Sequence, residues 1–121
     1  MTNLEIYNYA QAISEAFKDS TQYLPVKVNF YIQKNKNTLL SLAQDIEAQR
    51  TNIIKNYGQP SEENPDQYII PADNLEKAQQ ELMDLFSIEQ DVPVFKINVD
   101  LLPEDISLTT GQMEAIMFMF D

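Results

Sequence analysis

Carboxylates are the residues of this chain best able to do chemistry, because it contains neither histidine nor cysteine. Without histidine, the usual general acid–base residue and the Ser-His-Asp triad are excluded, and without cysteine there is no thiolate nucleophile. Three acidic groups remain, namely Glu62, Glu63 and Asp66, then Glu89 and Asp91, then Asp100, Glu104 and Asp105. Paired carboxylates can hydrolyse glycosides or bind calcium, but no group has the spacing and glycine of a calcium-binding loop. We therefore expect no catalytic, cofactor or metal site, and interpret these residues as helix caps and solvated turns.

A second set of residues could bind an anion. The main basic concentration is Lys27, Lys34, Lys36, Arg50 and Lys55, with Tyr23, Phe30 and Tyr31 among them. Basic residues between aromatic ones can follow single-stranded nucleic acid, but the net charge of −11 opposes phosphate binding, so nucleic acid is not expected as a partner. Lys34, Lys36 and Arg50 are the candidate contacts to a small anionic ligand, although one arginine provides only one guanidinium fork.

The charge is distributed unevenly along the chain. Residues 1–60 carry six Lys/Arg and five Asp/Glu, a net +1, whereas residues 61–121 carry two Lys and fourteen Asp/Glu, a net −12. An acidic half repels nucleic acid and anionic lipid and favours basic protein partners. It could also be an ordinary solvated face.

Length and composition indicate one domain, 1–121, of an intracellular protein. A chain of 121 residues can bury a core without disulfides. Its amino terminus lacks the basic and apolar regions of a secretory signal, and no apolar run is long enough to span a membrane. We expect a cytoplasmic location, with which the absence of cysteine is consistent.

Two helices are predicted in the first half. Thr2 and Glu5 have the spacing of a capping box, followed by apolar residues at steps of three and four through a helix at 4–19. A long helix is predicted over 26–57. It ends at Gly58, which suits a left-handed residue just past a helix end.

The long helix carries a heptad-like apolar seam. Its positions are Val28, Ile32, Asn35, Leu39, Leu42, Ile46, Gln49 and Ile53. A polar residue such as Asn35 on a seam can fix the register or oligomeric state of a coiled coil. Alternatively, the helix is the spine of the monomer and the seam is internal.

The second half is predicted to contain a loop at 58–67, a helix at 73–88, a strand at 93–101 and a helix at 110–120. Asp73 with Glu76, and Thr109 with Gln112, repeat the capping-box spacing. The apolar face of the third helix comprises Leu75, Ala78, Leu82, Leu85 and Phe86. The fold class is mainly α with a small antiparallel β element: four helices, the second one long, and one or two short strands.

The strand and the last helix suggest contacts between copies. The alternating strand residues Phe95, Ile97, Val99 and Leu101 could pair with Tyr68–Ile70 or with another copy. The last helix has Met113, Ile116, Met117 and Phe120 on one face, with Phe118 and Met119 elsewhere. A helix that is apolar nearly all round is deeply buried or part of an interface. We expect a homo-oligomer, most simply a dimer.

The run VKVNFYIQKNKNTLLSLAQDIEAQRTNIIKNYG, the helix-to-strand run NLEKAQQELMDLFSIEQDVPVFKINVDLL and the final LTTGQMEAIMFM resemble small uncharacterised proteins of tailed phages and prophages. The matching residues are Asn35, Leu39, Arg50, Tyr57, Gly58, Leu85, Glu89, Val92, Met113 and Met117. The resemblance covers most of the chain and implies a viral accessory protein in an infected bacterial host. It implies no active site.

The leading hypothesis is a non-enzymatic phage protein that binds another protein. Docking would use the acidic second half and the apolar carboxyl end, with Glu62, Glu63, Asp66, Phe118 and Phe120 as interaction residues. It could inhibit a host defence protein by presenting carboxylates in place of DNA phosphates. Two alternatives are a phage morphogenesis or assembly factor, and an oligomer that sequesters an anionic nucleotide between subunits.

Overall fold

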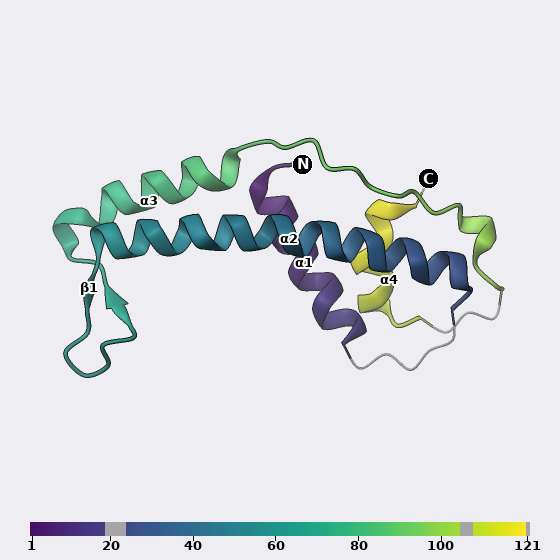
Figure 1. The fold of residues 1–121 in the computed structure, drawn as a ribbon, viewed down its shortest axis with the longest axis horizontal. Helices are drawn as coiled ribbons and strands as arrows, with labels where there is room; N and C mark the ends of the chain where they lie inside the picture. Colours follow the sequence, from purple (N-terminus) through teal and green to yellow (C-terminus); the bar gives the residue numbers. More distant parts are fainter. Residues whose placement is uncertain (19–23, 105–107, 121) are drawn as a thin grey trace.

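The computed structural model describes residues 1–18, 24–104 and 108–120. Within them the chain forms α1 (Asn3–Phe17), α2 (Val26–Tyr57), β1 (Gln59–Pro60), β2 (Tyr68–Ile69), α3 (Ala72–Ser87), the 3-10 turn η1 (Val99–Leu101), α4 (Thr110–Ile116) and the 3-10 turn η2 (Met117–Met119). The mainly α fold with a small antiparallel β element is confirmed (Figure 1). The predicted helix end at Asp19, and Tyr23 and Asp105, lie outside the described residues.

The long helix α2 is the spine of the molecule, about 48 Å long at 1.5 Å per residue. Most of its predicted seam faces inward, with Val28, Ile32, Asn35, Leu39 and Ile46 buried. Helices α1 and α4 gather at its amino-terminal half, and α3 packs along its carboxyl-terminal half (Figure 1). The interpretation of the seam as internal to the monomer is therefore supported over at least its first three heptads.

Two of the three expected capping boxes form. The Thr2 hydroxyl accepts a hydrogen bond from the Glu5 backbone, while the Glu5 carboxylate accepts one from the Thr2 backbone, and Thr109 and Gln112 do the same for α4. The Asp73–Glu76 box was wrong. Helix α3 starts one residue earlier, at Ala72, with Pro71 as its capping residue and no side-chain cap.

The strand predicted at 93–101 was also wrong. Residues 91–98 run back along α2 from the end of α3 as an extended segment (Figure 1), with only an isolated bridge from Ile97 to Phe120. The Asn35 side chain takes the place of a partner strand. Its amide donates to the Phe95 carbonyl at 2.9 Å and accepts from the Phe95 N–H at 2.8 Å. Tyr68–Ile69 pairs instead with Gln59–Pro60 in a hairpin.

Gly58 joins α2 to this hairpin through a close backbone contact. The left-handed conformation expected there was wrong, because φ is −103° and ψ is 171°. A Cβ at Gly58 would lie 2.5 Å from the Ile54 carbonyl oxygen and 3.3 Å from that of Ile69. Glycine is required here because a Cβ would clash with a carbonyl oxygen, and not because the backbone conformation excludes other residues.

The carboxyl end is a short helix that tightens into a 3-10 turn, so the helix predicted over 110–120 is α-helical only to Ile116. The change from an α-helix to a 3-10 turn alters which of the last residues face the core. Met119 is fully buried beside Ile116, whereas Met117 is exposed. The assignment of Met117 and Met119 to faces was therefore reversed.

The amino terminus is tied to a segment nearly ninety residues away. The N–H of Asn3 donates to the Ile88 carbonyl and that of Gln90 to the Met1 carbonyl, both at 2.8 Å. The Asn3 amide donates to the Leu85 carbonyl at 2.8 Å and accepts from the Gln90 amide at 2.7 Å. These bonds hold the start of α1 against the end of α3.

Candidate functional site

The acidic residues predicted for docking lie at one tip of the molecule. Glu62, Glu63 and Asp66 are exposed in the loop between β1 and β2. Two of their backbone groups are fixed by turn hydrogen bonds, from Glu63 to the Ser61 hydroxyl at 3.3 Å and from Asp66 to the Asn64 side chain at 3.2 Å. The three carboxylates do not come together as a metal-binding cluster. No group of three or more potential metal ligands occurs in the described part of the chain.

The aromatic residues predicted for docking lie far from that tip, near the other half of α2 (Figure 1). Phe118 stacks on Tyr9 of α1, with ring centroids 4.3 Å apart and planes 25° apart. Phe120 is half-buried and forms the bridge with Ile97. Both residues pack against the core, so the structure does not bring them together with the acidic loop into one surface.

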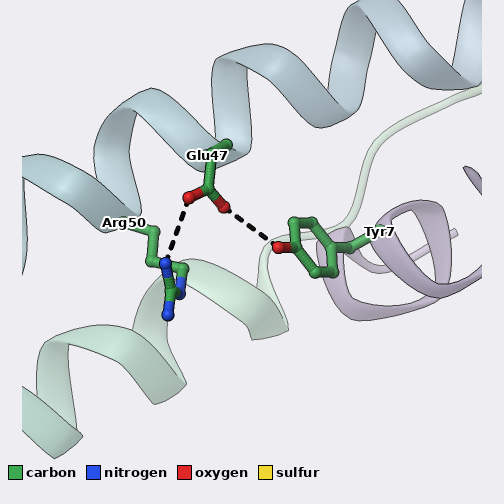
Figure 2. A network of polar contacts seen from close by, with 3 residues as sticks. All are labelled: Tyr7, Glu47 and Arg50. Carbon is green, nitrogen blue, oxygen red and sulfur yellow. Dashed lines mark hydrogen bonds and ion pairs between the residues drawn. The ribbon is translucent and has the colours of Figure 1, made fainter. Parts of the chain in front are cut away.

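The three candidate anion contacts are also separated. Lys34 and Lys36 lie on the first half of α2, and Arg50 lies 14 residues beyond Lys36, about 21 Å along the helix. The Arg50 guanidinium donates to Glu47 at 3.0 Å (Figure 2). Its charge is thereby directed at a carboxylate of its own chain.

Glu47 also connects α2 to α1. One carboxylate oxygen accepts from Arg50 and the other from the Tyr7 hydroxyl at 3.0 Å (Figure 2). The hydrogen bond to Glu47, followed by burial and by the charge of Glu47, raises the pKa of Tyr7 above its usual value of 10.0. The arrangement is a structural tie between helices.

Tyr7→Phe tests this tie. We expect a loss of about 1 kcal/mol at neutral pH, because the ring and its edge contact with Phe86 remain and one partly buried hydrogen bond is lost. Since the folded pKa is raised, the unfolded chain loses this proton first, so the contribution of Tyr7 to stability is present below pH 10 and declines as pH rises above it. Urea denaturation at pH 7 and at higher pH should show the variant and the parent converging. A constant difference would contradict the assignment, and Tyr9→Phe is the matched control.

A basic aromatic surface, here called the ridge, lies on the first half of α2. It consists of Lys27, Phe30, Tyr31 and Lys34 together with Phe95 from the extended segment. Tyr31 stacks on Phe95 with centroids 5.5 Å apart and planes 8° apart, and Phe30 meets Tyr31 edge-on at 6.2 Å. The Lys27 ammonium lies 5.9 Å from the Tyr31 ring centre and that of Lys34 lies 5.6 Å from Phe30. Phe30 is 55% exposed and Phe95 46%.

The sequence identified four of these five residues as basic or aromatic positions on one helix. It missed Phe95, which was predicted to lie in a strand at 93–101. No local signal could have placed Phe95 beside Tyr31, because its position depends on the hydrogen bonds from Asn35 across sixty residues.

Two further surfaces lie along α3. The first, here called the α2–α3 groove, has a volume of about 430 Å³ and is lined by Gln49, Ile53, Glu81, Asp84, Leu85 and Ile88. The second, here called the α3 stripe, comprises Leu75, Met83 and Phe86 of α3 with Leu4 of α1, beside a groove of about 360 Å³. Leu75 was predicted on the buried face, but Ala78 is the one α3 residue fully buried, and Met83 is 66% exposed.

Comparisons with protein-family models, with curated proteins and with solved structures found no match for this chain. Among the residues that the structure covers, no helix is both long enough and apolar enough to cross a membrane.

Proposed function

We propose that the protein is a non-enzymatic accessory protein of a phage that binds another protein through its arm. The arm is the carboxyl-terminal half of α2 with the β1–β2 hairpin and α3. The observation that carries this proposal is the α3 stripe: α3 packs on a single neighbouring helix over most of its length, and Leu75, Met83 and Leu4 remain exposed (Figure 1). An amphipathic helix with an uncovered apolar flank is a common docking element.

The charge of the arm favours a basic partner. Residues 58–91 contain nine Asp/Glu and one Lys, a net −8. On α3, Asp73, Glu76 and Asp84 are exposed and lie on one side of the helix by their spacing. An apolar stripe with a carboxylate rim resembles the usual anatomy of an interface, with an apolar centre and a polar edge.

This row of carboxylates supports inhibition of a host defence protein with a basic, DNA-binding groove over the assembly-factor alternative. The third alternative, sequestration of an anionic nucleotide, is less well supported, because Arg50 is paired with Glu47 and lies far from Lys34 and Lys36. The viral setting is supported by the resemblance of the chain to phage and prophage proteins.

Site-specific photo-crosslinking tests the proposal. A benzophenone amino acid is placed at Met83 on the stripe and, as a matched control, at the exposed Gln11 on α1. In an extract of the phage-infected bacterial host we expect a specific adduct at Met83 only. Neutralising Asp73, Glu76 and Asp84 as Asn, Gln and Asn should reduce its yield at least about tenfold, as expected for charge-steered binding.

The identity of the adduct separates the remaining alternatives. Competition by duplex DNA at moderate salt would support the inhibitor, and a virion protein as the adduct would support the assembly factor. Equal labelling from Met83 and Gln11, or a yield unaffected by neutralisation, would contradict docking through the arm.

A further inference from the structure

We propose that two copies of the chain associate antiparallel along α2, with the ridge of each copy seated in the α2–α3 groove of the other. The pairing uses two surfaces outside the α3 stripe and shares only Asp84 with the carboxylate row beside that stripe. Each copy would contribute the same two surfaces, which is the arrangement of a closed two-fold dimer.

The ridge has the properties of the protruding half of an interface. Two aromatic rings, Phe30 and Phe95, are about half exposed, and aromatic residues are enriched at the centres of protein interfaces. Within the described residues, neither Lys27 nor Lys34 forms an ion pair with a carboxylate. Their ammonium groups are instead held over aromatic rings, at the edge of the exposed apolar area.

The α2–α3 groove has the complementary properties. Its floor is apolar, formed by the half-buried Ile53 and Leu85 and by Ile88, which is 51% exposed. Its rim carries the exposed carboxylates of Glu81 and Asp84. Aromatic rings entering this groove would cover its floor, and the lysines of the ridge would reach carboxylates at its rim.

The two surfaces lie on the same side of α2. Tyr31 of the ridge and Gln49 of the groove are 18 residues apart, which is five turns of 3.6 residues, so they point in the same direction. The separation along the helix is about 27 Å. A second copy turned end for end, with its two-fold axis near residue 40, therefore places a ridge opposite a groove at both ends.

The surface between the ridge and the groove allows two helices to approach. A hollow of about 390 Å³ lies there, lined by Lys34, Asn37, Thr38, Ser41 and Leu42. Two of its five lining residues, Thr38 and Ser41, have small side chains, which permit helices to pack at the usual distance of about 8–10 Å. The extended segment that carries Phe95 of the ridge runs along α2 from the end of α3 toward the amino-terminal end of α2 (Figure 1).

Charge selects a second copy as the occupant over nucleic acid. The residues from Leu24 to Gln44 contain three lysines and no acidic residue, whereas the arm is strongly acidic. Single-stranded nucleic acid could stack on the ridge, but would be repelled by the acidic groove on the same face. A second copy satisfies both surfaces at once.

Charge exchange between the two surfaces tests the pairing in purified protein. One chain carries Lys27→Glu and Lys34→Glu, and another carries Glu81→Lys and Asp84→Lys. We expect the parent to have twice the 14.0 kDa chain mass by sedimentation equilibrium and each variant alone to have the single mass, with dimer Kd raised at least about tenfold by facing like charges. Mixing the variants should restore the dimer, because both contacts then join opposite charges.

The matched control makes the same change in net charge at two other positions. Lys18→Glu with Lys55→Glu alters two exposed lysines outside the ridge, and this chain should dimerise as the parent does. All the altered residues are exposed, and circular dichroism should show each variant folded with a melting temperature close to that of the parent.

Chemical crosslinking gives an independent measure of the orientation. The chain has no cysteine, so Ser41→Cys and Lys55→Cys each introduce a single thiol. In the antiparallel pair the two copies of residue 41 lie close to the two-fold axis, and those of residue 55 lie about 45 Å apart along the helices. A bismaleimide with a span of about two helix turns, some 11 Å, should join Cys at 41 and not at 55.

Three results would overturn the proposal. The first is a parent that stays monomeric at 100 µM and low salt, a concentration well above a micromolar Kd. The second is a mixture of folded charge variants that remains monomeric. The third is crosslinking at residue 55 in preference to 41. Specific binding of an oligothymidine to the ridge, lost in the Lys27→Glu and Lys34→Glu chain, would assign this surface to nucleic acid instead.

Discussion

Ile46→Asp is expected to unfold the protein. Ile46 is 2% exposed and lies on the inward face of α2, where α1 and α3 both pack against the helix. Removing a buried isoleucine alone costs about 2–5 kcal/mol, and a carboxylate at that position would have to be buried without a partner or protonated. Since small domains are stable by about 5–15 kcal/mol, we expect loss of the cooperative transition in urea and of most helical circular dichroism.

The position of Ile46 on a heptad-like seam makes this experiment informative about assembly. If the seam joined two copies, the variant would remain folded and native mass spectrometry would show it as a monomer. The matched control is Ala48→Asp, two residues along the same helix and exposed, which should cost less than about 1 kcal/mol through helix propensity. A folded Ile46→Asp monomer would refute an internal seam.

Asn35→Ala is expected to cost about 3 kcal/mol. Asn35 is 1% exposed, and its amide is the partner of both backbone groups of Phe95. Truncation leaves the partly buried backbone donor and acceptor of Phe95 without their side-chain partner, and each such group costs about 1–3 kcal/mol unless water reaches it. The free energy of unfolding, measured by urea denaturation, should fall accordingly.

The same substitution has a consequence at the ridge. Phe95 would lose its fixed position beside Tyr31, so its amide should exchange with deuterium much faster than in the parent. Asn37→Ala is the matched control, because Asn37 is exposed and, among the residues that the structure describes, its side chain bonds only to that of Gln33, at 3.0 Å. A stability loss that is equal for Asn35→Ala and Asn37→Ala would show that the contact with Phe95 contributes little.

The helices and two of their caps could be predicted from the sequence because their signals are local. Thr2 with Glu5, and Thr109 with Gln112, satisfy backbone groups three residues away, and the bounds of α2 follow directly from Pro25 and Gly58. The apolar seam similarly identifies the buried face of α2. Such features depend on side chains within one or two turns of each other.

Two of the errors concern residues whose partners are distant in the chain. The alternating pattern after Pro93 is that of a strand, but Asn35 occupies the place of its neighbour, and no spacing within the sequence indicates that contact. The last helix was extended to residue 120 because its apolar residues fit a helical period. The α-helix instead gives way to a 3-10 turn after Ile116, and the segment finishes in a bridge between Ile97 and Phe120.

The candidate surfaces were predicted less well than the fold. The acidic character of the second half and the basic, aromatic character of early α2 can be read from the residues. The function of these surfaces cannot be read in this way, since the position of Phe95 and the exposure of Met83 follow from tertiary packing. Patterns of residue type in the sequence indicate the chemical character of a surface, but the fold determines which residues lie on the same surface.

The hydrogen bonds that tie the amino terminus to residues 85–90 set the order in which the chain can fold during synthesis. Helix α1 emerges before the other helices and packs mainly on α2, but its remaining tertiary partners are Ile88, Gln90 and, through the Gln112 amide that donates to the Ala16 carbonyl at 3.1 Å, helix α4. Helices α2 and α3 are joined by a short hairpin and can pair as soon as both have emerged. We therefore expect α1, α2 and α3 to begin packing while the chain is being made, whereas the contact of α1 with α4 forms only once α4 has emerged.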